Sequence, residues 1–404
     1  MKMIEGGVTA ALGFAAGGVH CGIRKNKSKP DLAMIVSDRP CAAAAVYTQN
    51  LVKGAPILVT QKNIADGCAQ AVICNSGNAN TCNADGLEKA EKMCELAAAA
   101  LGLQPSDMVV ASTGVIGQVL PLEPIESGIP ELVKSLSSTG STAAATAIMT
   151  TDTQAKEAAV EVEIGGKAVK IGGISKGSGM IHPNMATMLS FVTTDCAITP
   201  QMLQKAVSQV TEVTFNMISV DGDTSTNDTF AVLANGAAGN PEIAGEGPDF
   251  EAFVAGLEAV CRSLAKKMAG DGEGATKLLV CQVSGAVDWD MARTVSKGVI
   301  CSTLLKAAMF GGDANWGRVL CAIGYSGAAV DVNKIDVSFC SSLGQVDVCK
   351  NGAGIPFSEE KAAQVLSAGE IHILVDLHLG EVSGEAYGCD LTYDYVKING
   401  DYRT

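Results

Sequence analysis

Residues 174–195 read ISKGSGMIHPNMATMLSFVTTD. The two glycines of the KGSG run make the approach flexible, whereas Pro183 fixes its own φ and biases His182 toward an extended conformation. The apolar run from Thr187 to Thr194 then predicts a strand. The stretch therefore predicts a constrained loop that leads directly into a strand of a sheet.

The hydroxyl of Thr187 stands where this loop becomes a strand, well placed to attack the carbonyl carbon of Ala186. Water would release the resulting ester, leaving Thr187 as a new N-terminus. A threonine hydroxyl is a weak nucleophile without a base beside it. The freed α-amine, with a reference pKa of about 7.7 to 8.0, can accept its proton near neutral pH. The pattern is compatible with self-cleavage that creates a catalytic nucleophile.

A plainer interpretation is that Thr187 is a β-branched residue in a half-buried strand, where threonine is common. The local pattern alone favours this plainer interpretation. Self-cleavage at Thr187 is favoured only by a resemblance that extends over more of the chain.

Outward from this stretch, helical and strand periods alternate, which predicts an α/β or α+β architecture. We expect a layered sandwich of helices and sheets with a smaller C-terminal α/β domain. Expected helices are 87–101, one that opens at Thr199-Pro200, 250–268 and 291–309; expected strands are 71–74, 108–111, 187–194, 278–283 and 371–377. Residues 235–249 and 351–356 are expected to be loops.

The length of 404 residues favours two domains over one very large core. We expect a main domain over 1–280 and a C-terminal domain over 281–404. The expected cleavage would divide the chain differently, into an alpha segment 1–186 and a beta segment that starts at 187.

The composition excludes several classes of function. A formal net charge of −14 disfavours nucleic acid as a partner, and no apolar run is long enough to predict a membrane span. The N-terminus lacks an export signal, so we expect a cytoplasmic protein whose 14 cysteines are mostly reduced and buried.

Three motifs that could indicate a metal or phosphate site fail on spacing. The cysteines and histidines show neither C-x-x-C nor H-E-x-x-H, so no metal is expected. Residues 221–228 alternate carboxylates with glycine but lack the calcium-binding glutamate at the twelfth position, which favours a tight turn. Residues 270–277 are rich in glycine but lack the order of a phosphate-binding loop.

The run PNMATML at 183–189, preceded by KGSGM at 176–180, resembles the nucleophile motif of the ornithine acetyltransferase family, the glutamate N-acetyltransferases of arginine biosynthesis. Other segments resemble that family in order along nearly the whole chain: AAGGVHCGI at 15–23, CNSGNAN at 74–80, STGVIG at 112–117, DGDTSTND at 221–228, GDGEGATK at 270–277, GDANWGR at 312–318 and INGDYRT at 398–404.

This resemblance implies self-cleavage between Ala186 and Thr187, and transfer of acetyl from N-acetylornithine to glutamate through an ester on Thr187. It implies that Thr113 and Gly114 stabilise the oxyanion. It implies substrate binding by Thr153, Lys176, Thr187, Glu273, Asn399 and Thr404. We further expect Lys176 to meet a substrate carboxylate and Glu273 the ornithine amine. Without the resemblance, both charges would be read as solvated surface groups.

Resemblance also implies an assembly of two alpha and two beta segments, with small molecules as partners and no bound cofactor. Acetyl-CoA is a possible second acetyl donor, because some members of the family use it and others do not. Gly400 departs from the alanine usual in the family and makes the tail more flexible. The alternatives are an N-terminal-nucleophile amidase or aminopeptidase, which would pass the acyl group to water, and an uncut binding or structural protein.

Overall fold

The structure is a computed structural model, and it describes residues 1–182 and 188–401. Ala186, Thr187 and Thr404 lie outside the described residues. The chain forms two compact units, each from several stretches of sequence. The first unit comprises 1–177, 183–216 and 224–264, and the second comprises 178–182, 217–223 and 265–404. The second unit therefore includes residues 265–280, which the expected division at residue 280 assigns to the main domain.

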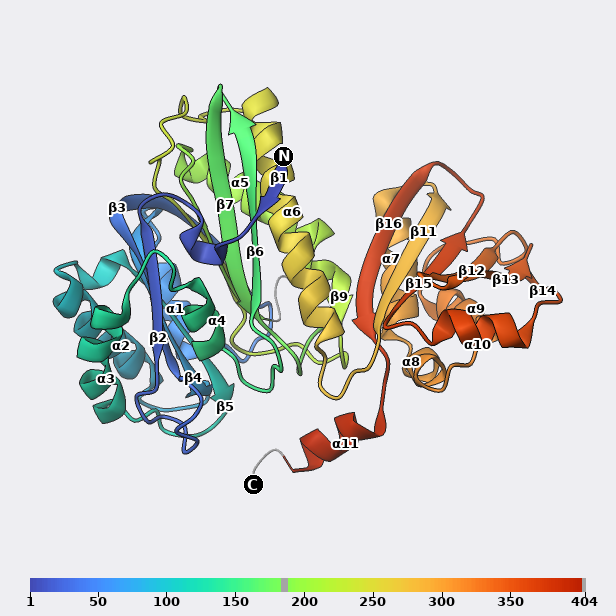
Figure 1. Ribbon diagram of the computed structural model, residues 1–404, viewed down its shortest axis with the longest axis horizontal. Helices are drawn as coiled ribbons and strands as arrows, with labels where there is room; N and C mark the ends of the chain where they lie inside the picture. The colour runs from blue at the N-terminus through green and yellow to red at the C-terminus, as the bar shows by residue number, and fades with distance from the viewer. Residues whose placement is uncertain (183–187, 402–404) are drawn as a thin grey trace. The chain divides into compact units, whose positions relative to one another are not determined.

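A nine-stranded mixed sheet forms the centre of the first unit, in the order β1-β6-β7-β8-β10-β3-β4-β5, with β2 paired to β3 (Figure 1). Its strands are β1 Lys2–Ile4, β2 Phe14–Val19, β3 Leu32–Tyr47, β4 Cys68–Asn78, β5 Met108–Val115, β6 Lys156–Ile164, β7 Lys167–Lys176, β8 Leu189–Thr194 and β10 Thr229–Ala234. β4 runs parallel to β5 and β8 parallel to β10, whereas the other pairs are antiparallel.

Both faces of this sheet are buried, because successive side chains of a strand point to opposite faces. On β3, Ala33 and Ile35 belong to one apolar core, and Leu32 and Met34 belong to another. The first of these cores includes residues of α4 Ser141–Ala147. The second includes residues of α2 Gly86–Leu101 and α3 Glu123–Ser135. Helices on two faces of one sheet give the layered arrangement expected from the sequence.

Local signals set the ends of several helices. α2 ends at Gly102, whose φ of +71° suits glycine, and α5 Pro200–Val213 begins after Thr199, whose hydroxyl accepts the backbone N–H of Met202. The remaining helices of this unit are α1 Ala55–Asn63 and most of α6 Pro248–Gly270, with short 3-10 turns at Gly7–Thr9, Pro105–Asp107 and Phe215–Met217.

A seven-stranded sheet forms the centre of the second unit, in the order β14-β13-β12-β15-β11-β16-β9. Its strands are β9 Ile218–Ser219, β11 Leu278–Ala286, β12 Asp336–Ser341, β13 Gly344–Lys350, β14 Ala353–Gly354, β15 Glu370–Asp376 and β16 Val382–Cys389. Its helices are α7 Trp289–Cys301, α8 Thr303–Phe310, α9 Trp316–Tyr325, α10 Glu359–Leu366 and α11 Tyr393–Gly400. One apolar core joins this sheet to α7, α8, α9 and α10.

The mixed α/β class is confirmed, with three local corrections. The helix expected over 291–309 is two helices, because the Ser302 hydroxyl accepts the backbone N–H of Leu305 and starts α8. Within the described residues the strand expected from 187 begins at Leu189. The loop expected over 351–356 contains the short strand β14.

Two general properties accompany this fold. All 14 cysteines are free thiols, and Cys74, Cys261, Cys281 and Cys389 are among the buried ones. Within residues 1–182 and 188–401, no helix is both long and apolar enough to cross a membrane.

Candidate active site

The predicted site residues are divided between the two units. Thr113, Gly114, Thr153 and Lys176 belong to the first unit, whereas Glu273 and Asn399 belong to the second. The roles assigned to these residues remain predictions.

The predicted oxyanion turn lies at the end of β5, against the end of β4. Gly114 pairs with Gly77 and adopts a φ of +131°. A Cβ on Gly114 would lie 2.4 Å from the carbonyl carbon of Gly77, so only glycine fits without displacing the backbone. Thr113 is buried beside it, with 7% of its surface exposed. Tight packing therefore fixes the backbone that would offer the oxyanion a donor.

A buried asparagine braces this turn. Asn227 donates its side-chain amide to the backbone oxygens of Ala79 (2.5 Å) and Ser112 (2.9 Å). Its amide oxygen accepts the hydroxyls of Thr81 and Thr226, each at 2.6 Å. Every polar atom of the Asn227 side chain is thus engaged, which holds the residue before Thr113 in one position.

Lys176 ends β7 and is almost buried, with 8% of its surface exposed. Its positive charge acts on two buried carboxyl groups, those of Asp152 and Asp228. Burial by itself raises the pKa of Asp152, but the ammonium groups of Lys156 and Lys176 outweigh it and lower that pKa to about 2. Asp152 accepts Lys156 Nζ at 2.6 Å and the backbone N–H of Gly177 at 2.8 Å.

Asp228 behaves in the opposite way. Complete burial raises the pKa of its carboxyl well above the usual value, although Ser225 and Lys176 oppose the shift. Its Oδ2 atom has no hydrogen-bond partner among the described residues. Two ammonium groups, those of Lys156 and Lys176, therefore act on the one strongly ionised carboxylate of Asp152, and the excess positive charge can attract a further anion such as a substrate carboxylate. Thr153 lies exposed in the loop between α4 and β6, one residue after Asp152.

In the second unit, the predicted substrate residues Glu273 and Asn399 are in direct contact. Asn399 Nδ2 donates to Glu273 Oε2 at 2.7 Å. The backbone N–H of Glu273 donates to the oxygen of Ser178 at 3.1 Å. A Cβ on Gly179 would lie 2.4 Å from the Glu273 carboxyl group, so a larger residue at that position would displace this side chain. The structure brings together two residues that are 126 positions apart in the chain.

In the same unit, Asp221 binds the backbone of residues 180–181, a contact that the sequence did not predict and that we call the Asp221 clamp. The Asp221 carboxylate accepts the backbone N–H groups of Met180 at 2.7 Å and Ile181 at 3.0 Å. The backbone N–H of Val220 donates to the oxygen of Ile181 at 2.7 Å. Met180 has a φ of +55°, which is uncommon for a residue with a side chain. Asp221 therefore holds a strained backbone immediately upstream of residues 183–187.

Next to this clamp, His182 lies between two polar side chains. Its Nδ1 is 3.1 Å from Ser219 Oγ and 3.6 Å from Cys301 Sγ. Burial lowers the pKa of His182 to about 4, and the nearby positive charge of Lys297 adds to the effect.

Asp221 and Asp152 could not be recognised from side-chain pattern, because their partners include backbone N–H groups distant in sequence. In residues 221–228, expected to be a tight turn, the backbone bends at Asp221, whose Oδ1 accepts the N–H of Asp223 at 3.2 Å. Among residues 1–182 and 188–401, no three His, Cys, Asp or Glu side chains form a group that could hold a metal ion.

Comparison with known proteins adds independent information. Residues 15–404 match the ArgJ family. The arginine biosynthesis bifunctional protein ArgJ of Symbiobacterium thermophilum is 52% identical over 406 residues, covering 100% of both chains. The protein of the same name from Bacillus subtilis is 49% identical over 403 residues, covering 99% of this chain and 97% of the relative.

Solved structures resemble this chain as well. The crystal structure of arginine biosynthesis bifunctional protein ArgJ from Bacillus halodurans is 48% identical, with a TM-score of 0.51, and covers 53% of this chain and 99% of the solved chain. The match over almost the whole sequence and the identity to full-length relatives lead to one conclusion: the chain belongs to the ArgJ family.

Proposed function

We propose that this protein transfers acetyl from N2-acetyl-L-ornithine to L-glutamate through an acetyl ester on Thr187, and so acts in arginine biosynthesis in the cytoplasm. Membership of the ArgJ family and the PNMATML run at 183–189 support this assignment. The observation that carries it furthest is the placement of Lys176, a nearly buried cation whose charge acts on the buried carboxyls of Asp152 and Asp228. The substrates and products of the transfer are all amino-acid carboxylates.

The proposed maturation step precedes the first turnover. The Thr187 hydroxyl attacks the Ala186 carbonyl carbon, the carbon–nitrogen bond breaks, and the freed α-amine takes up the proton. Water then hydrolyses the ester between Ala186 and Thr187, leaving a carboxylate on segment 1–186 and a hydroxyl on segment 187–404. The α-amine and hydroxyl of Thr187 then form a base and nucleophile on one residue.

The sheet of the first unit suits a chain that is cut and stays assembled. β8 and β10, which follow Thr187, lie between β7 and β3, which precede it. Ladder hydrogen bonds join β7 to β8 over Ile171–Lys176, and β10 to β3 over six paired residues. Separating the two segments would break these ladders and expose the apolar core to which Ile174 contributes from one segment and Leu189 and Phe191 from the other, so cleavage would leave one folded particle.

The solved relative gives a second line of support. The Bacillus halodurans chain matches over 99% of its own length and yet covers only 53% of this chain. Residues 187–404 are slightly more than half of the 404 residues, which is the length that cleavage before Thr187 would leave.

Each transfer would proceed in two matched steps. The Thr187 hydroxyl attacks the acetyl carbonyl of N-acetylornithine, releasing ornithine, and the amine of glutamate then attacks the ester. Thr113 and the backbone N–H of Gly114 would donate to the oxyanion in both steps. Lys176 would bind a substrate carboxylate, and Glu273, beside Asn399, would bind the ornithine amine. Thr153 and Thr404 would complete the substrate contacts.

Two finer assignments extend the proposal. Acetyl-CoA would serve as a second acetyl donor, in keeping with the word bifunctional in the relatives' names. Two copies of each segment would form the working assembly.

The test is an acetyl-labelling assay. With acetyl-labelled N-acetylornithine, the proposal predicts label on the fragment that contains Thr187 and then on N-acetylglutamate, with parallel lines in a two-substrate plot. Release of labelled acetate at the same rate without glutamate would overturn the transferase in favour of an amidase. Thr187→Ala, a matched control, should accept no label and remain a single chain.

A further inference from the structure

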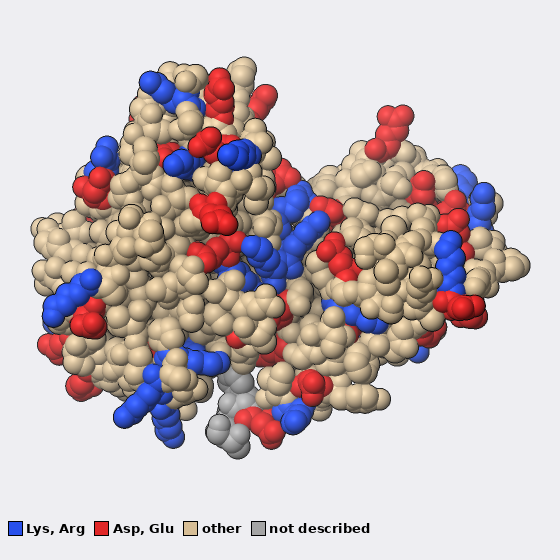
Figure 2. All heavy atoms as spheres, viewed as in Figure 1, with Lys and Arg blue, Asp and Glu red and all other residues tan. Residues whose placement is uncertain are grey.

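The loop between β2 and β3 carries the densest group of positive charge in an acidic protein. Arg24, Lys25, Lys27 and Lys29 fall within six residues, whereas the chain has a formal net charge of −14. Figure 2 shows Lys and Arg side chains gathered at the lower edge of the first unit, where Figure 1 places this loop. We refer to residues 24–29 as the basic loop.

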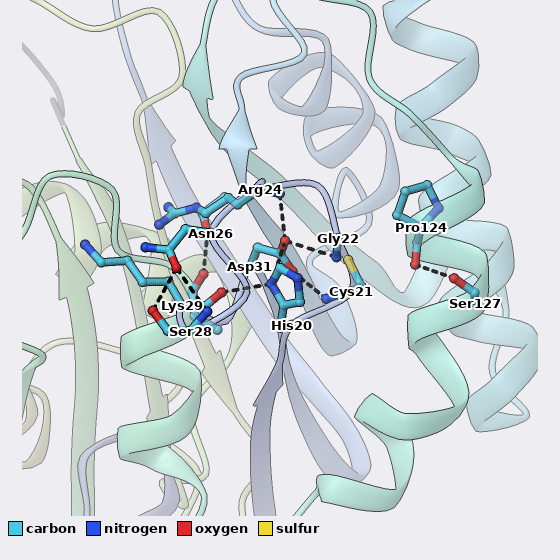
Figure 3. A network of polar contacts seen from close by, with 12 residues as sticks. His20, Cys21, Gly22, Arg24, Asn26, Ser28, Lys29, Asp31, Pro124 and Ser127 are labelled. Atoms are coloured by element: carbon cyan, nitrogen blue, oxygen red, sulfur yellow. Dashed lines mark hydrogen bonds and ion pairs between the residues drawn. The ribbon is translucent and has the colours of Figure 1, made fainter. Parts of the chain in front are cut away.

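A buried carboxylate holds the start of the basic loop. Asp31, with none of its surface exposed, accepts the backbone N–H groups of Cys21 (2.6 Å), Gly22 (3.2 Å) and Arg24 (2.9 Å). His20 Nδ1 lies 3.4 Å from the same carboxylate (Figure 3). Further along, the backbone N–H of Lys29 donates to the Asn26 oxygen. The basic loop is thus a preorganised turn.

Its three lysines point their charge toward solvent. Lys25, Lys27 and Lys29 are exposed, and none of them forms an ion pair with any described residue. Holding like charges so close together is unfavourable, because exposed charges within about 10 Å still repel at physiological salt. An anion with several charges would remove that repulsion.

The start of the basic loop, at Arg24, lies beside the end of β4, which pairs with the predicted oxyanion turn. The backbone oxygen of Asp31 accepts the N–H of Ser76 at 2.9 Å. Arg24 Cγ lies 2.8 Å from the position that a Cβ on Gly77 would occupy, and Gly77 is the strand partner of Gly114. Lys27 is three residues from Arg24, so the backbone of Lys27 lies within roughly 10 Å of the backbone of Arg24.

We propose that Lys25, Lys27 and Lys29 bind the phosphate groups of acetyl-CoA, with its acetyl end directed to the turn at Thr113 and Gly114. This inference rests on the proposed function, since it assigns a phosphate site to the second acetyl donor. N-acetylornithine has no phosphate and would not use the basic loop.

The chemistry of this donor balances without another reactant. The Thr187 hydroxyl attacks the thioester carbon, and the carbon–sulfur bond breaks. The proton of the hydroxyl leaves by way of the α-amine and ends on the sulfur of CoA. The products are the same acetyl ester on Thr187 and free CoA thiol.

The experiment compares two triple variants of the full-length, matured enzyme. One combines Lys25→Gln, Lys27→Gln and Lys29→Gln. The control combines Lys167→Gln, Lys350→Gln and Lys361→Gln, three exposed lysines outside the basic loop that change the net charge equally. Initial rates of glutamate acetylation are measured with acetyl-CoA and, separately, with N-acetylornithine. Calorimetry with CoA alone measures binding without turnover.

With each lost contact worth about 0.2–1 kcal/mol, the loop variant should raise KM for acetyl-CoA and Kd for CoA by roughly 3- to 150-fold. Its KM for N-acetylornithine should stay within about twofold of wild type, and the control variant should match wild type with both donors. Higher salt should weaken CoA binding to wild type and affect the loop variant much less.

Equal KM for acetyl-CoA in wild type and loop variant would overturn the inference, as would failure of CoA to bind wild type. Either result can occur while acetyl still passes from N-acetylornithine to glutamate, so the proposed function would stand. If no transfer from either donor occurs, the proposed function fails, and CoA calorimetry still decides the inference.

Discussion

Asn399 reaches from the last helix of the chain to donate a 2.7 Å hydrogen bond to the carboxylate of Glu273. A chain end is usually frayed, but α11 is anchored at both of its ends. Near its start, the Thr392 hydroxyl donates to the Gly274 oxygen at 2.7 Å, and near its end Asn399 is held by Glu273. The tail is therefore built onto the turn that carries the predicted amine-binding carboxylate.

Removing either partner of this contact should weaken binding of the ornithine part of the substrate. Glu273→Gln loses a charged acceptor, an interaction of about 1.5–3 kcal/mol, so KM for N-acetylornithine should rise roughly tenfold or more. KM for glutamate should change less. Asn399→Ala should give a smaller rise, and Asn333→Ala, in an exposed turn of the same unit, should give none. An unchanged ratio of the two KM values in Glu273→Gln would contradict the assignment of the amine to Glu273.

Gly114→Ala should damage both the turn and the reaction. The added methyl would meet Gly77 at 2.4 Å in a backbone with φ of +131°. Loss of one oxyanion donor typically lowers kcat by about 10²- to 10³-fold. Gly117→Ala is the matched control, because Gly117 also has a positive φ, +77°, but a Cβ there would meet nothing within 4 Å. Similar kcat in the two variants would argue against an oxyanion role.

Asp221→Asn should slow self-cleavage more than it lowers stability. The variant weakens the charge-assisted hydrogen bonds to the N–H groups of Met180 and Ile181, which hold the strained backbone before residues 183–187. We expect the uncut chain to persist roughly tenfold longer after synthesis, measured by gel electrophoresis over time. Asp223→Asn, two residues away and exposed, serves as control. If Asp221→Asn and wild type mature at one rate, the clamp has no part in cleavage.

Acid should destabilise the second unit through His182. Its pKa of about 4 lies below the ordinary value of about 6.5, so between these pH values the unfolded chain binds more protons than the folded one. This contribution to stability is complete above pH 6.5 and is lost as the pH falls toward 4. Lys297 strengthens the shift and Asp221 opposes it. The thermal midpoint of His182→Gln should therefore fall less between pH 7 and pH 5 than that of wild type; identical slopes would contradict this origin.

Local signals in the sequence predicted much of the secondary structure. The order of Thr199 and Pro200 and the glycine at 102 predicted where helices begin and end, because caps involve neighbours in the chain. The break at Ser302 was missed, since an apolar period continues through it and a single serine cap does not interrupt that pattern. The mixed α/β class followed from the alternation of periods.

The contacts of the candidate active site were harder to predict from the sequence than the secondary structure. Glu273 and Asn399 were each assigned to the substrate by resemblance alone, and their contact was not predicted, because nothing in their spacing indicates it. Asp31, Asp152 and Asp221 were not identified, since each accepts hydrogen bonds from backbone N–H groups that carry no mark in the sequence. The role of these carboxylates can be recognised only once the fold is known.

The most direct test of the central claim is the intact mass of the purified protein, with N-terminal sequencing of any fragment. Self-cleavage predicts two fragments that remain together until denatured, the second beginning Thr-Met-Leu-Ser. A single uncut chain with full acetyl-transfer activity would contradict the account, because Thr187 would then lack the free α-amine that the mechanism requires.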